Sequence, residues 1–260
     1  MSEALCGIIV LARTGSSRLP AKSLLDLCGR PVLAHQLDRL KLSRRAERIG
    51  LATTTLAEDN ALCDVARAAG IEVFRGSPTD VLRRMGDAAD VFGLSFLVVV
   101  GGDDVMCEGE FVDEVIAHYE HTGDDFITME GVPFGTSPFG LSADSLRRVL
   151  AIRADDASDG WERLFTETGL FKVGKVVQRD PQLRHPEIRL DLDYPEDYEL
   201  LQAIYGRLYD GNVPSLRRVL RLLVDEEPAL ALINRPAREK WLKNCAVAWP
   251  PLRLKPEALD

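Results

Sequence analysis

Short apolar segments alternate with longer amphipathic ones through the first half of the chain, and this alternation constrains the fold more than any other feature. The apolar segments are rich in Val and Ile and have the length of strands, whereas the segments between them carry helical patterns. This order of elements is typical of βαβ units, which build a mainly parallel sheet in an α/β fold. We predict strands at 7–12, 48–54, 71–75 and 95–100, and helices at 31–40, 59–69 and 79–92.

The second half begins in the same way, with a predicted helix at 110–121 and a predicted strand at 126–129. From Gly131 the sequence GVPFGTSPFG repeats Pro and Gly, which favours a loop or an extended excursion. In residues 188–193 (IRLDLD) apolar and polar residues alternate, so a strand there would place Arg189, Asp191 and Asp193 on one face. We further predict a strand at 170–177 and helices at 142–168, 195–208, 215–224 and 228–233.

The bulk composition limits the classes of partner. The 260 residues suffice for one large α/β domain, and 46% hydrophobic and 28% charged residues are ordinary for a globular protein. A net charge of −9 argues against a nucleic-acid or anionic-membrane surface, because both need a basic field. We recognise neither a membrane span nor a signal peptide. The five scattered cysteines form no CxxC pair, which favours reduced thiols in a cytoplasmic protein.

The segment ARTGSSRLPAK, directly after the first predicted strand, is typical of an anion-binding loop. Small residues let successive backbone N–H groups converge on an anion, while arginine and lysine suit phosphate oxygens. The alternative is an ordinary surface loop with solvated cations, because short Gly-rich patterns often match by chance. The predicted polyphosphate-binding residues are Leu11, Ala12, Arg13, Gly15, Ser16, Ser17, Arg18 and Lys22.

Carboxylates follow two later predicted strands. Asp103 comes after the fourth strand, where Gly102 permits a close approach of backbone and ligand, and Asp193 ends the alternating segment. Carboxylates beside a polyphosphate imply Mg²⁺, so we predict Asp103 and Asp193 as metal ligands of a nucleotidyl-transfer site. In the alternative interpretation Asp103 caps a loop and Asp193 is the N-cap of the helix that begins at Pro195.

Two further strand ends carry polar side chains. Thr53 and Thr54 end the second predicted strand, where their hydroxyls could bond a ribose or a base, although threonine is also common at strand ends. Asp80 follows the third strand in FRGSPTD. The alternative there is a helix start capped by Ser77 or Thr79.

Together these motifs resemble the sugar-activating cytidylyltransferases, the family that makes CMP-sialic acid and CMP-Kdo, and within it the spore-coat-polysaccharide type. ARTGSSRLPAKSL, ATTT, FRGSPTDVLRR, the Gly-Asp element after the fourth strand and DYPED carry the likeness, which covers residues 7 to 240. The resemblance implies a nucleotide-diphospho-sugar transferase fold: a Rossmann-like, GT-A-type three-layer sandwich with CTP bound over the first strand.

The same resemblance assigns roles to residues. It implies that Arg13, Arg18 and Lys22 hold the triphosphate, with Gly15, Ser16 and Ser17 lining it. It places Thr53, Thr54 and Asp80 near cytidine or the acceptor, and Mg²⁺ on Asp103 and Asp193. The chain departs from this pattern at two places. Where the family usually carries Gly-Asp-Cys-Pro, it has Gly102-Asp103-Asp104-Val105. In addition, Asp191 adds a carboxylate before DYPED. Both departures concern the acceptor more than the reaction.

The expected reaction is CTP + acceptor → CMP-acceptor + pyrophosphate, with Arg13, Lys22, Asp103 and Asp193 as the catalytic residues and Mg²⁺ as cofactor. The acceptor is an acidic sugar or a phosphorylated small molecule. We expect a single domain over 1–245, in which 131–178 forms an acceptor lid and a homodimer surface, and an extended tail over 246–260. A GT-A-like glycosyltransferase and a non-catalytic nucleotide-binding module are the alternatives.

Overall fold

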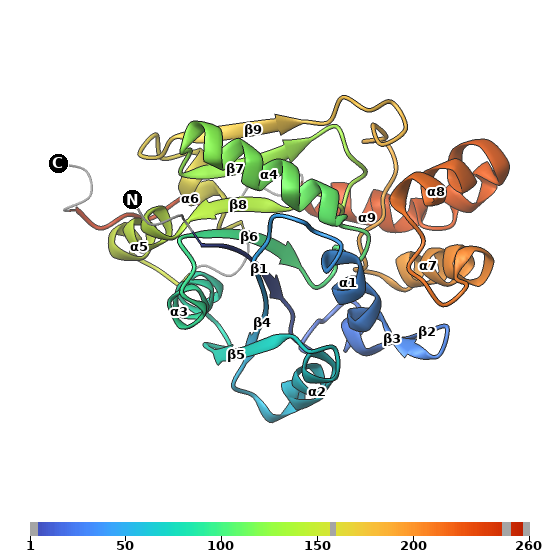
Figure 1. The fold of residues 1–260 in the computed structure, drawn as a ribbon, viewed down its shortest axis with the longest axis horizontal. Coiled ribbons are helices and arrows are strands. Elements are labelled where there is room, and N and C mark those ends of the chain that lie inside the picture. The colour runs from blue at the N-terminus through green and yellow to red at the C-terminus, as the bar shows by residue number, and fades with distance from the viewer. Residues whose placement is uncertain (1–4, 157–159, 246–250, 257–260) are drawn as a thin grey trace.

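A seven-stranded sheet of order β5-β4-β1-β6-β8-β7-β9 forms the centre of the molecule (Figure 1). The computed structural model describes residues 5–156, 160–245 and 251–256. The pairs among β1, β4, β5 and β6 and the pair β7–β9 are parallel, and β8 alone runs antiparallel to its neighbours. The predicted mainly parallel sheet is therefore confirmed. The strands are β1 (Cys6–Leu11), β4 (Arg48–Thr54), β5 (Glu72–Gly76), β6 (Phe96–Gly101), β7 (Phe126–Glu130), β8 (Phe139–Ser142) and β9 (Val173–Val177).

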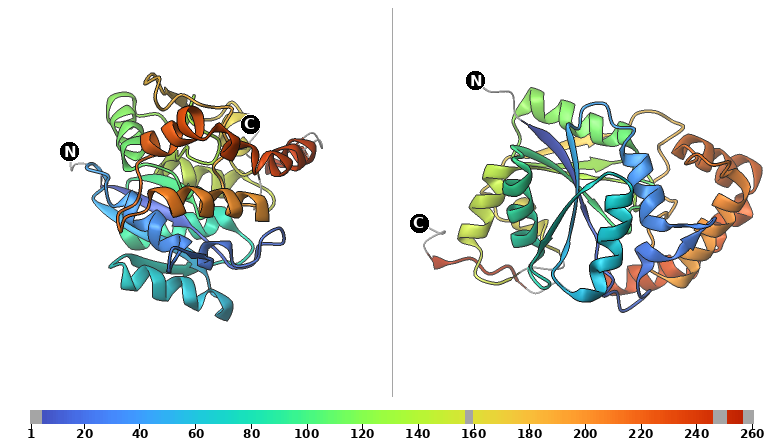
Figure 2. Two further views of the ribbon diagram at one scale, coloured as in Figure 1. Left: turned by 90° about the vertical axis from the view of Figure 1, so that its right-hand side faces the viewer. Right: turned by 60° about the horizontal axis from the view of Figure 1, so that its bottom comes forward.

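Helices cover both faces of the sheet, which confirms the predicted three-layer sandwich (Figure 2). On β1 the side chains alternate between the two layers, so that Ile8 and Val10 pack on one face and Ile9 on the other. Each of these three residues is buried because helices lie against both faces. One face carries α1 (Val32–Leu40), α2 (Asn60–Ala68) and α4 (Gly109–Thr122), and the other carries α3 (Val81–Phe92), α5 (Ala143–Ile152) and α6 (Arg163–Thr166).

The carboxyl-terminal helices gather at one end of the sheet, beside a small hairpin of β2 (Asp26–Leu27) and β3 (Arg30–Pro31) (Figure 1). Leu27 of the hairpin shares a hydrophobic cluster with Leu200 and Leu216. The prediction contains no helix at α9, because its sequence is rich in charged residues and shows little apolar periodicity. The helical segments here are α7 (Pro195–Leu208), α8 (Leu216–Arg221), η3 (Leu222–Glu226), η4 (Pro228–Leu232) and α9 (Arg235–Cys245).

Strand β8 begins at the end of the segment GVPFGTSPFG, which we predicted to be a loop or an extended excursion. Its Pro- and Gly-rich sequence hides the strand, yet the glycine at its centre has a packing reason. A Cβ atom on Gly140 would lie 2.6 Å from Val115 Cγ1 and 2.7 Å from Phe96 Cζ. Only a glycine therefore lets β8 sit between β6 and β7 under the helix layer.

The predicted helix over 142–168 is wrong in its middle, since the structure has α5, then a turn, then the short α6. The helix ends at Arg153, whose backbone is extended and whose side chain turns inward to a carboxylate. Residues 157–159 of the prediction lie outside the described residues. The charged sequence after Ile152 offers no apolar face that could hold a continuing helix against the sheet.

The predicted strand over 188–193 is also wrong, although its alternation is correct. The segment is extended and buried but joins no sheet; it bonds instead to loops, through an isolated bridge of Arg189 with Phe134 and a bond from Leu192 N to Asp103 O of 3.0 Å. Its apolar residues, Ile188, Leu190 and Leu192, join the third hydrophobic cluster. The polar residues face the opposite way, as the period of two requires.

The described part of the tail, residues 251–256, is extended and lies against the end of α5. Ala154 N donates to Arg253 O at 3.0 Å, and Lys255 N donates to Ile152 O at 2.7 Å. Leu252 packs against the cluster beneath α3 and α5. Residues 246–250 and 257–260 of the expected tail lie outside the described residues.

Candidate functional site

The loop after β1 is held in place by a hydrogen bond within its own backbone and by the carboxylate of Asp59, which follows β4. The carboxylate of Asp59 accepts bonds from Thr14 N and Thr14 Oγ1, both at 2.7 Å. Ala21 N donates to Thr14 O at 3.0 Å and so closes the loop upon itself. Burial works against ionisation of Asp59, but its bonds to Thr54 and Thr14 outweigh burial and lower its pKa. The loop is therefore a fixed structure, as an anion-binding loop must be.

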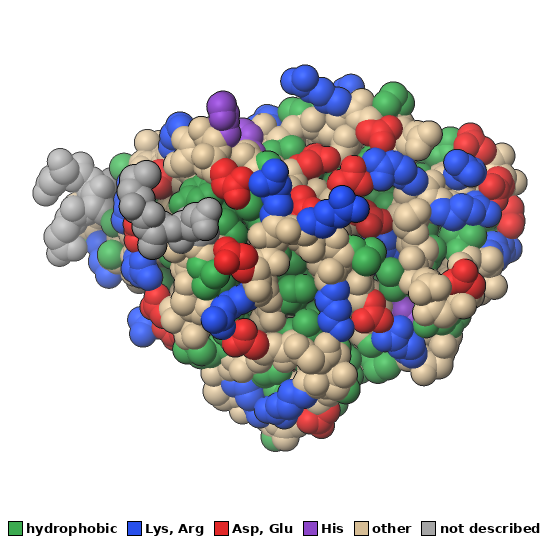
Figure 3. Space-filling view, viewed as in Figure 1, with side chains coloured by type: hydrophobic (Ala, Val, Ile, Leu, Met, Phe, Trp, Pro, Cys, Tyr) green, Lys and Arg blue, Asp and Glu red, His purple; other side chains and the backbone are tan. Residues whose placement is uncertain are grey.

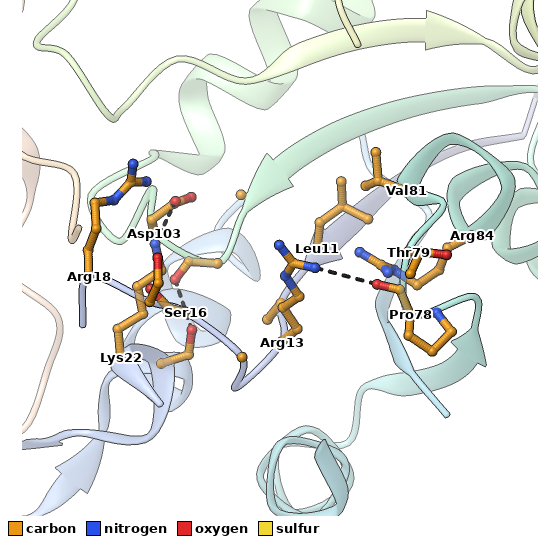
Figure 4. A pocket seen from close by; sticks show the side chains of 16 residues that line it. Leu11, Arg13, Ser16, Arg18, Lys22, Pro78, Thr79, Val81, Arg84 and Asp103 are labelled. Carbon is orange, nitrogen blue, oxygen red and sulfur yellow. Dashed lines mark hydrogen bonds and ion pairs between the residues drawn. The ribbon is translucent and has the colours of Figure 1, made fainter. Parts of the chain in front are cut away.

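A pocket of about 370 Å³ opens between this loop, the carboxyl end of β6 and the start of α3 (Figure 4). The structure brings ten of the predicted site residues to its wall. They are Leu11, Ala12, Arg13, Gly15, Ser16, Ser17, Arg18, Lys22, Gly102 and Asp103.

Glycine is required where β6 meets the loop. A Cβ atom on Gly102 would lie 2.8 Å from Ala12 Cβ and 3.1 Å from Leu11 O. This close approach brings Asp103, the next residue, to the pocket wall beside the loop. The carboxyl ends of β1 and β6 therefore form one continuous edge, the place where open parallel sheets bind their ligands.

Two carboxylates from distant segments meet at one lysine. Lys22 Nζ lies 2.8 Å from Asp103 Oδ2 and 2.6 Å from Asp193 Oδ1. Arg18 Nη2 lies 2.7 Å from the second oxygen of Asp193. Asp193 is 5% exposed and reaches the site through these two cations. The first loop, the end of β6 and the segment before α7 thus converge on one point, with Lys22 and Asp103 visible together in Figure 4.

Each charged group in this cluster stabilises the ionised form of its partners. Burial opposes the charge of Lys22, but Asp103 and Asp193 outweigh burial and raise the pKa of the ammonium. Burial likewise opposes ionisation of Asp193, whereas Lys22 and Arg18 outweigh it and lower the pKa of that carboxyl. Both groups are therefore charged at neutral pH, which keeps the donors and acceptors of the cluster in their binding forms.

The donor set fits a hard divalent cation. Two carboxylates already share one cation, the ammonium of Lys22, so their oxygens face a common centre. Within the described residues no cluster of three or more His, Cys, Asp and Glu side chains could hold a metal by itself. Two carboxylates completed by phosphate oxygens and water match the preference of Mg²⁺.

Four predicted site residues are absent from the pocket wall: Thr53, Thr54, Asp80 and Asp193. Asp193 bonds to Lys22 and Arg18 of the wall, whereas the other three make structural contacts, and their predicted place near cytidine or the acceptor stays a prediction. The Thr53 side chain is buried in β4, and Thr54 Oγ1 donates to Asp59. Asp80 is the N-cap of α3, accepting from Arg83 N at 2.9 Å, and Arg153 Nη1 donates to it at 2.8 Å. The cap is thus Asp80, and neither Ser77 nor Thr79 as the alternative supposed.

The alternative role for Asp193 is also wrong, because another residue caps α7. The carboxylate of Asp197 accepts from Asp193 N at 3.1 Å and from Tyr194 N at 2.9 Å. Asp197 stands in the first turn of the helix, where a negative charge is favoured. The Asp193 side chain is consequently left to bond Lys22 and Arg18.

The ion pair of Asp80 with Arg153 gives a testable pH dependence. Burial opposes ionisation of Asp80, but Arg153 outweighs it and lowers the pKa of this carboxyl. A lowered pKa adds stability that is complete above the ordinary Asp range and is lost as the pH falls through the lowered value. We expect Arg153→Met to reduce the free energy of unfolding by a constant amount above about pH 5 and by progressively less below about pH 4. Urea unfolding of both proteins from pH 7 to pH 3 measures this; a difference that stays constant down to pH 3 would contradict it.

Six lining residues were not predicted. Ser23, Pro78, Thr79, Val81, Arg84 and Gly101 also line the pocket. Helical spacing could have identified two of these residues together, because Val81 and Arg84 are three residues apart and share one face of α3. The buried guanidinium of Arg84 is the most unusual member, being 4% exposed.

The fold and the pocket together define an α/β nucleotide-binding transferase. A family model described as Cytidylyltransferase matches residues 7–212, and the chain belongs to this family of CTP-dependent nucleotidyltransferases. A Methanocaldococcus jannaschii protein, MJ1063, is 30% identical over 89% of this chain and 95% of its own length. The spore coat polysaccharide biosynthesis protein SpsF of Bacillus subtilis is 27% identical over 83% of this chain and 92% of its own.

A solved structure shares the fold. The cytidylyltransferase from Leptospira borgpetersenii serovar Hardjo-bovis superposes with a TM-score of 0.79 and 24% identity, over 88% of this chain and 97% of that one. In the part of the chain that the structure describes, no helix is long and apolar enough to cross a membrane. On the face shown in Figure 3, Lys and Arg are interspersed with Asp and Glu.

Proposed function

We propose that this cytidylyltransferase transfers CMP from Mg²⁺-bound CTP to a small acceptor and releases pyrophosphate. One observation supports the proposal above all others: the meeting of Lys22, Asp103 and Asp193 beside the loop-lined pocket. A loop of small residues and cations suits a triphosphate, and the two carboxylates suit the metal that accompanies one.

The chemistry follows from where charge develops. The acceptor oxygen attacks the α-phosphorus in line, and the bond from that phosphorus to the bridging oxygen breaks, so the leaving pyrophosphate gains negative charge. Arg13, Arg18 and Lys22 supply cationic donors for this charge, and the backbone amides of Gly15 to Ser17 supply neutral ones. Asp103 and Asp193 would hold Mg²⁺, which neutralises phosphate charge when bound.

For the acceptor we propose an acidic sugar or a phosphorylated small molecule, used in the cytoplasm to build a surface glycan. The name of the Bacillus relative, a polysaccharide biosynthesis protein, favours this pathway class. Asp104, whose side chain accepts a bond from Gly101 N at 3.0 Å, directly follows Asp103, and we propose that it contributes to the choice of acceptor.

We also retain the proposal that residues 131–178, within a single catalytic domain, form the acceptor lid and a homodimer surface. Leu170, Val173 and Val177 are each about 40% exposed along the β9 edge of the sheet, and such an edge favours association. Sedimentation equilibrium tests this arrangement, and a monomer at micromolar concentration would remove the dimer surface.

Two other functions remain to be separated by experiment. A GT-A-like glycosyltransferase would consume a sugar nucleotide and release no pyrophosphate, and a non-catalytic module would bind nucleotide without turnover. The number of cations in the loop favours a triphosphate over a sugar diphosphate.

A pyrophosphate-release assay distinguishes all three functions. We expect release from CTP in the presence of acidic sugars or sugar phosphates and Mg²⁺, little release from ATP, GTP or UTP, and none after chelation with EDTA. Binding of CTP without any release across the acceptor panel would favour the non-catalytic module, and release of a free nucleoside diphosphate from a sugar nucleotide would favour the glycosyltransferase.

A further inference from the structure

The guanidinium of Arg84 is buried beside the pocket without a carboxylate partner. Its Nη1 donates to Ser77 O at 2.7 Å, and its Nε has no hydrogen-bond partner. In the described part of the chain, no Asp or Glu forms an ion pair with it. Its immediate neighbour Arg83, in contrast, is exposed and pairs with Asp87 at 2.9 Å. A buried charge with an unsatisfied donor is costly unless something outside the chain completes it.

The surroundings of Arg84 make that cost larger. Burial lowers the pKa of the guanidinium, and the charge of Arg13 lowers it further. The Arg13 side chain extends toward Pro78, and its Nη1 makes a long bond of 3.4 Å to Pro78 O (Figure 4). Since Arg84 lines the cavity, the missing acceptor is supplied most simply by a bound ligand.

The pocket has two chemically different ends. One end holds Arg18, Lys22 and Asp103, where the triphosphate and the metal belong (Figure 4). The other end is bounded by Leu11, Pro78 and Val81, whose apolar surfaces suit the faces of a planar ring. There Arg84 offers donors and the Pro78 carbonyl offers an acceptor. A nucleotide held by its phosphates at the first end extends its base toward the second.

We propose that Arg84 reads the base of the bound nucleotide by donating to the O2 and N3 acceptors of cytosine. The neighbouring Pro78 carbonyl would then accept from the exocyclic amine, which uracil lacks. This inference rests on the proposed function, because it takes CTP as the substrate. It makes Arg84 a specificity residue, with no part in holding pyrophosphate.

The test compares ligands that carry the base with one that does not. We would measure the dissociation constants of CTP, UTP and inorganic pyrophosphate, all with Mg²⁺, by titration calorimetry for the wild type, Arg84→Met and Arg84→Lys. Arg83→Met is the matched control, because it removes the adjacent, exposed arginine. Arg84→Lys retains a buried charge and so provides a folded variant should Arg84→Met not fold.

We expect both Arg84 variants to bind CTP about 10- to 100-fold more weakly, the effect of losing hydrogen bonds from a charged donor. Their preference for CTP over UTP should fall about 10-fold, with the remainder supplied by the Pro78 carbonyl, while pyrophosphate binding and the Arg83→Met control remain within about twofold of the wild type. Equal weakening of pyrophosphate and CTP would overturn the inference, because Arg84 would then be a phosphate ligand. Unchanged base preference would also overturn it.

These outcomes separate the inference from the proposed function. Wild-type protein that prefers another nucleotide would refute the choice of CTP, and loss of that preference in Arg84→Lys would keep the base-reading role. Wild-type protein that prefers CTP and releases pyrophosphate, with variants that keep the preference, would refute the role of Arg84 alone.

Discussion

Replacing Lys22 by Ala should lower the rate of pyrophosphate release from CTP by about 10²- to 10³-fold, and Asp103→Ala should do the same. Among the described residues, Lys22 is the only one that forms ion pairs with both Asp103 and Asp193. Its loss removes a donor for phosphate charge, takes the paired cation from Asp103 and leaves Asp193 with Arg18 alone. The rate is measured at saturating CTP and Mg²⁺, and circular dichroism and a thermal melt verify that each variant is folded.

Lys41→Ala is the control for the charge change, because Lys41 is exposed and only loosely paired with Asp38 at 3.5 Å. It should keep the wild-type rate. Near-native rates in both Lys22→Ala and Asp103→Ala would refute the assignment of the reaction centre. A rise in KM with an unchanged kcat would instead mean that Lys22 holds substrate and transition state equally well.

Replacing Arg189 by Met should cost about 3–5 kcal/mol of the free energy of unfolding. Arg189 is 3% exposed and bonds two buried carboxylates, with Nη2 at 2.9 Å from Asp191 and Nε at 3.0 Å from Asp197. It also lies 5.2 Å from the ring of Phe134, a cation–π contact. Without the guanidinium both side chains remain buried and lose their cation, and Asp197 keeps only its bonds from neutral donors, which is the costly outcome.

Urea unfolding of wild type and variant at pH 7 measures this loss. Arg235→Met is the control, since Arg235 is exposed and pairs with Glu239 at 3.3 Å, and it should change the free energy of unfolding by less than about 1 kcal/mol. A loss in Arg189→Met no greater than that of the control would show that Asp191 and Asp197 find other partners or take up protons.

The sequence allowed most of the sheet to be predicted, because its strands are apolar runs separated by helical periodicity. The prediction from sequence failed where tertiary contacts determine the local structure. Strand β8 is defined by a glycine that fits beneath α4, and no local pattern encodes such a fit. The segment 188–193 has the alternation of a strand but lies beside loops, so its backbone bonds go to loop atoms such as Phe134 and Asp103.

The site could be predicted where its functional residues are adjacent in the sequence, as in the loop around Lys22. The meeting of that loop with Asp193, 171 positions away, followed from the motifs that resemble a known family and is present in the structure. Arg84 was not foreseen, because arginine in an amphipathic helix is usually exposed. The cap role of Asp80 was not foreseen, because a short polar residue before a helix serves equally as a cap or as a ligand.

The position of β8 has a consequence for a nascent chain leaving the ribosome. The chain makes β6 and β7 first, yet β8 must come between them. The strands β1, β4, β5 and β6 can assemble as they emerge, but β6 then has an unpaired edge until β8, which ends at residue 142, has been made. If synthesis stalls or ends before that point, the incomplete sheet has an exposed edge that can pair with other nascent chains on the same mRNA.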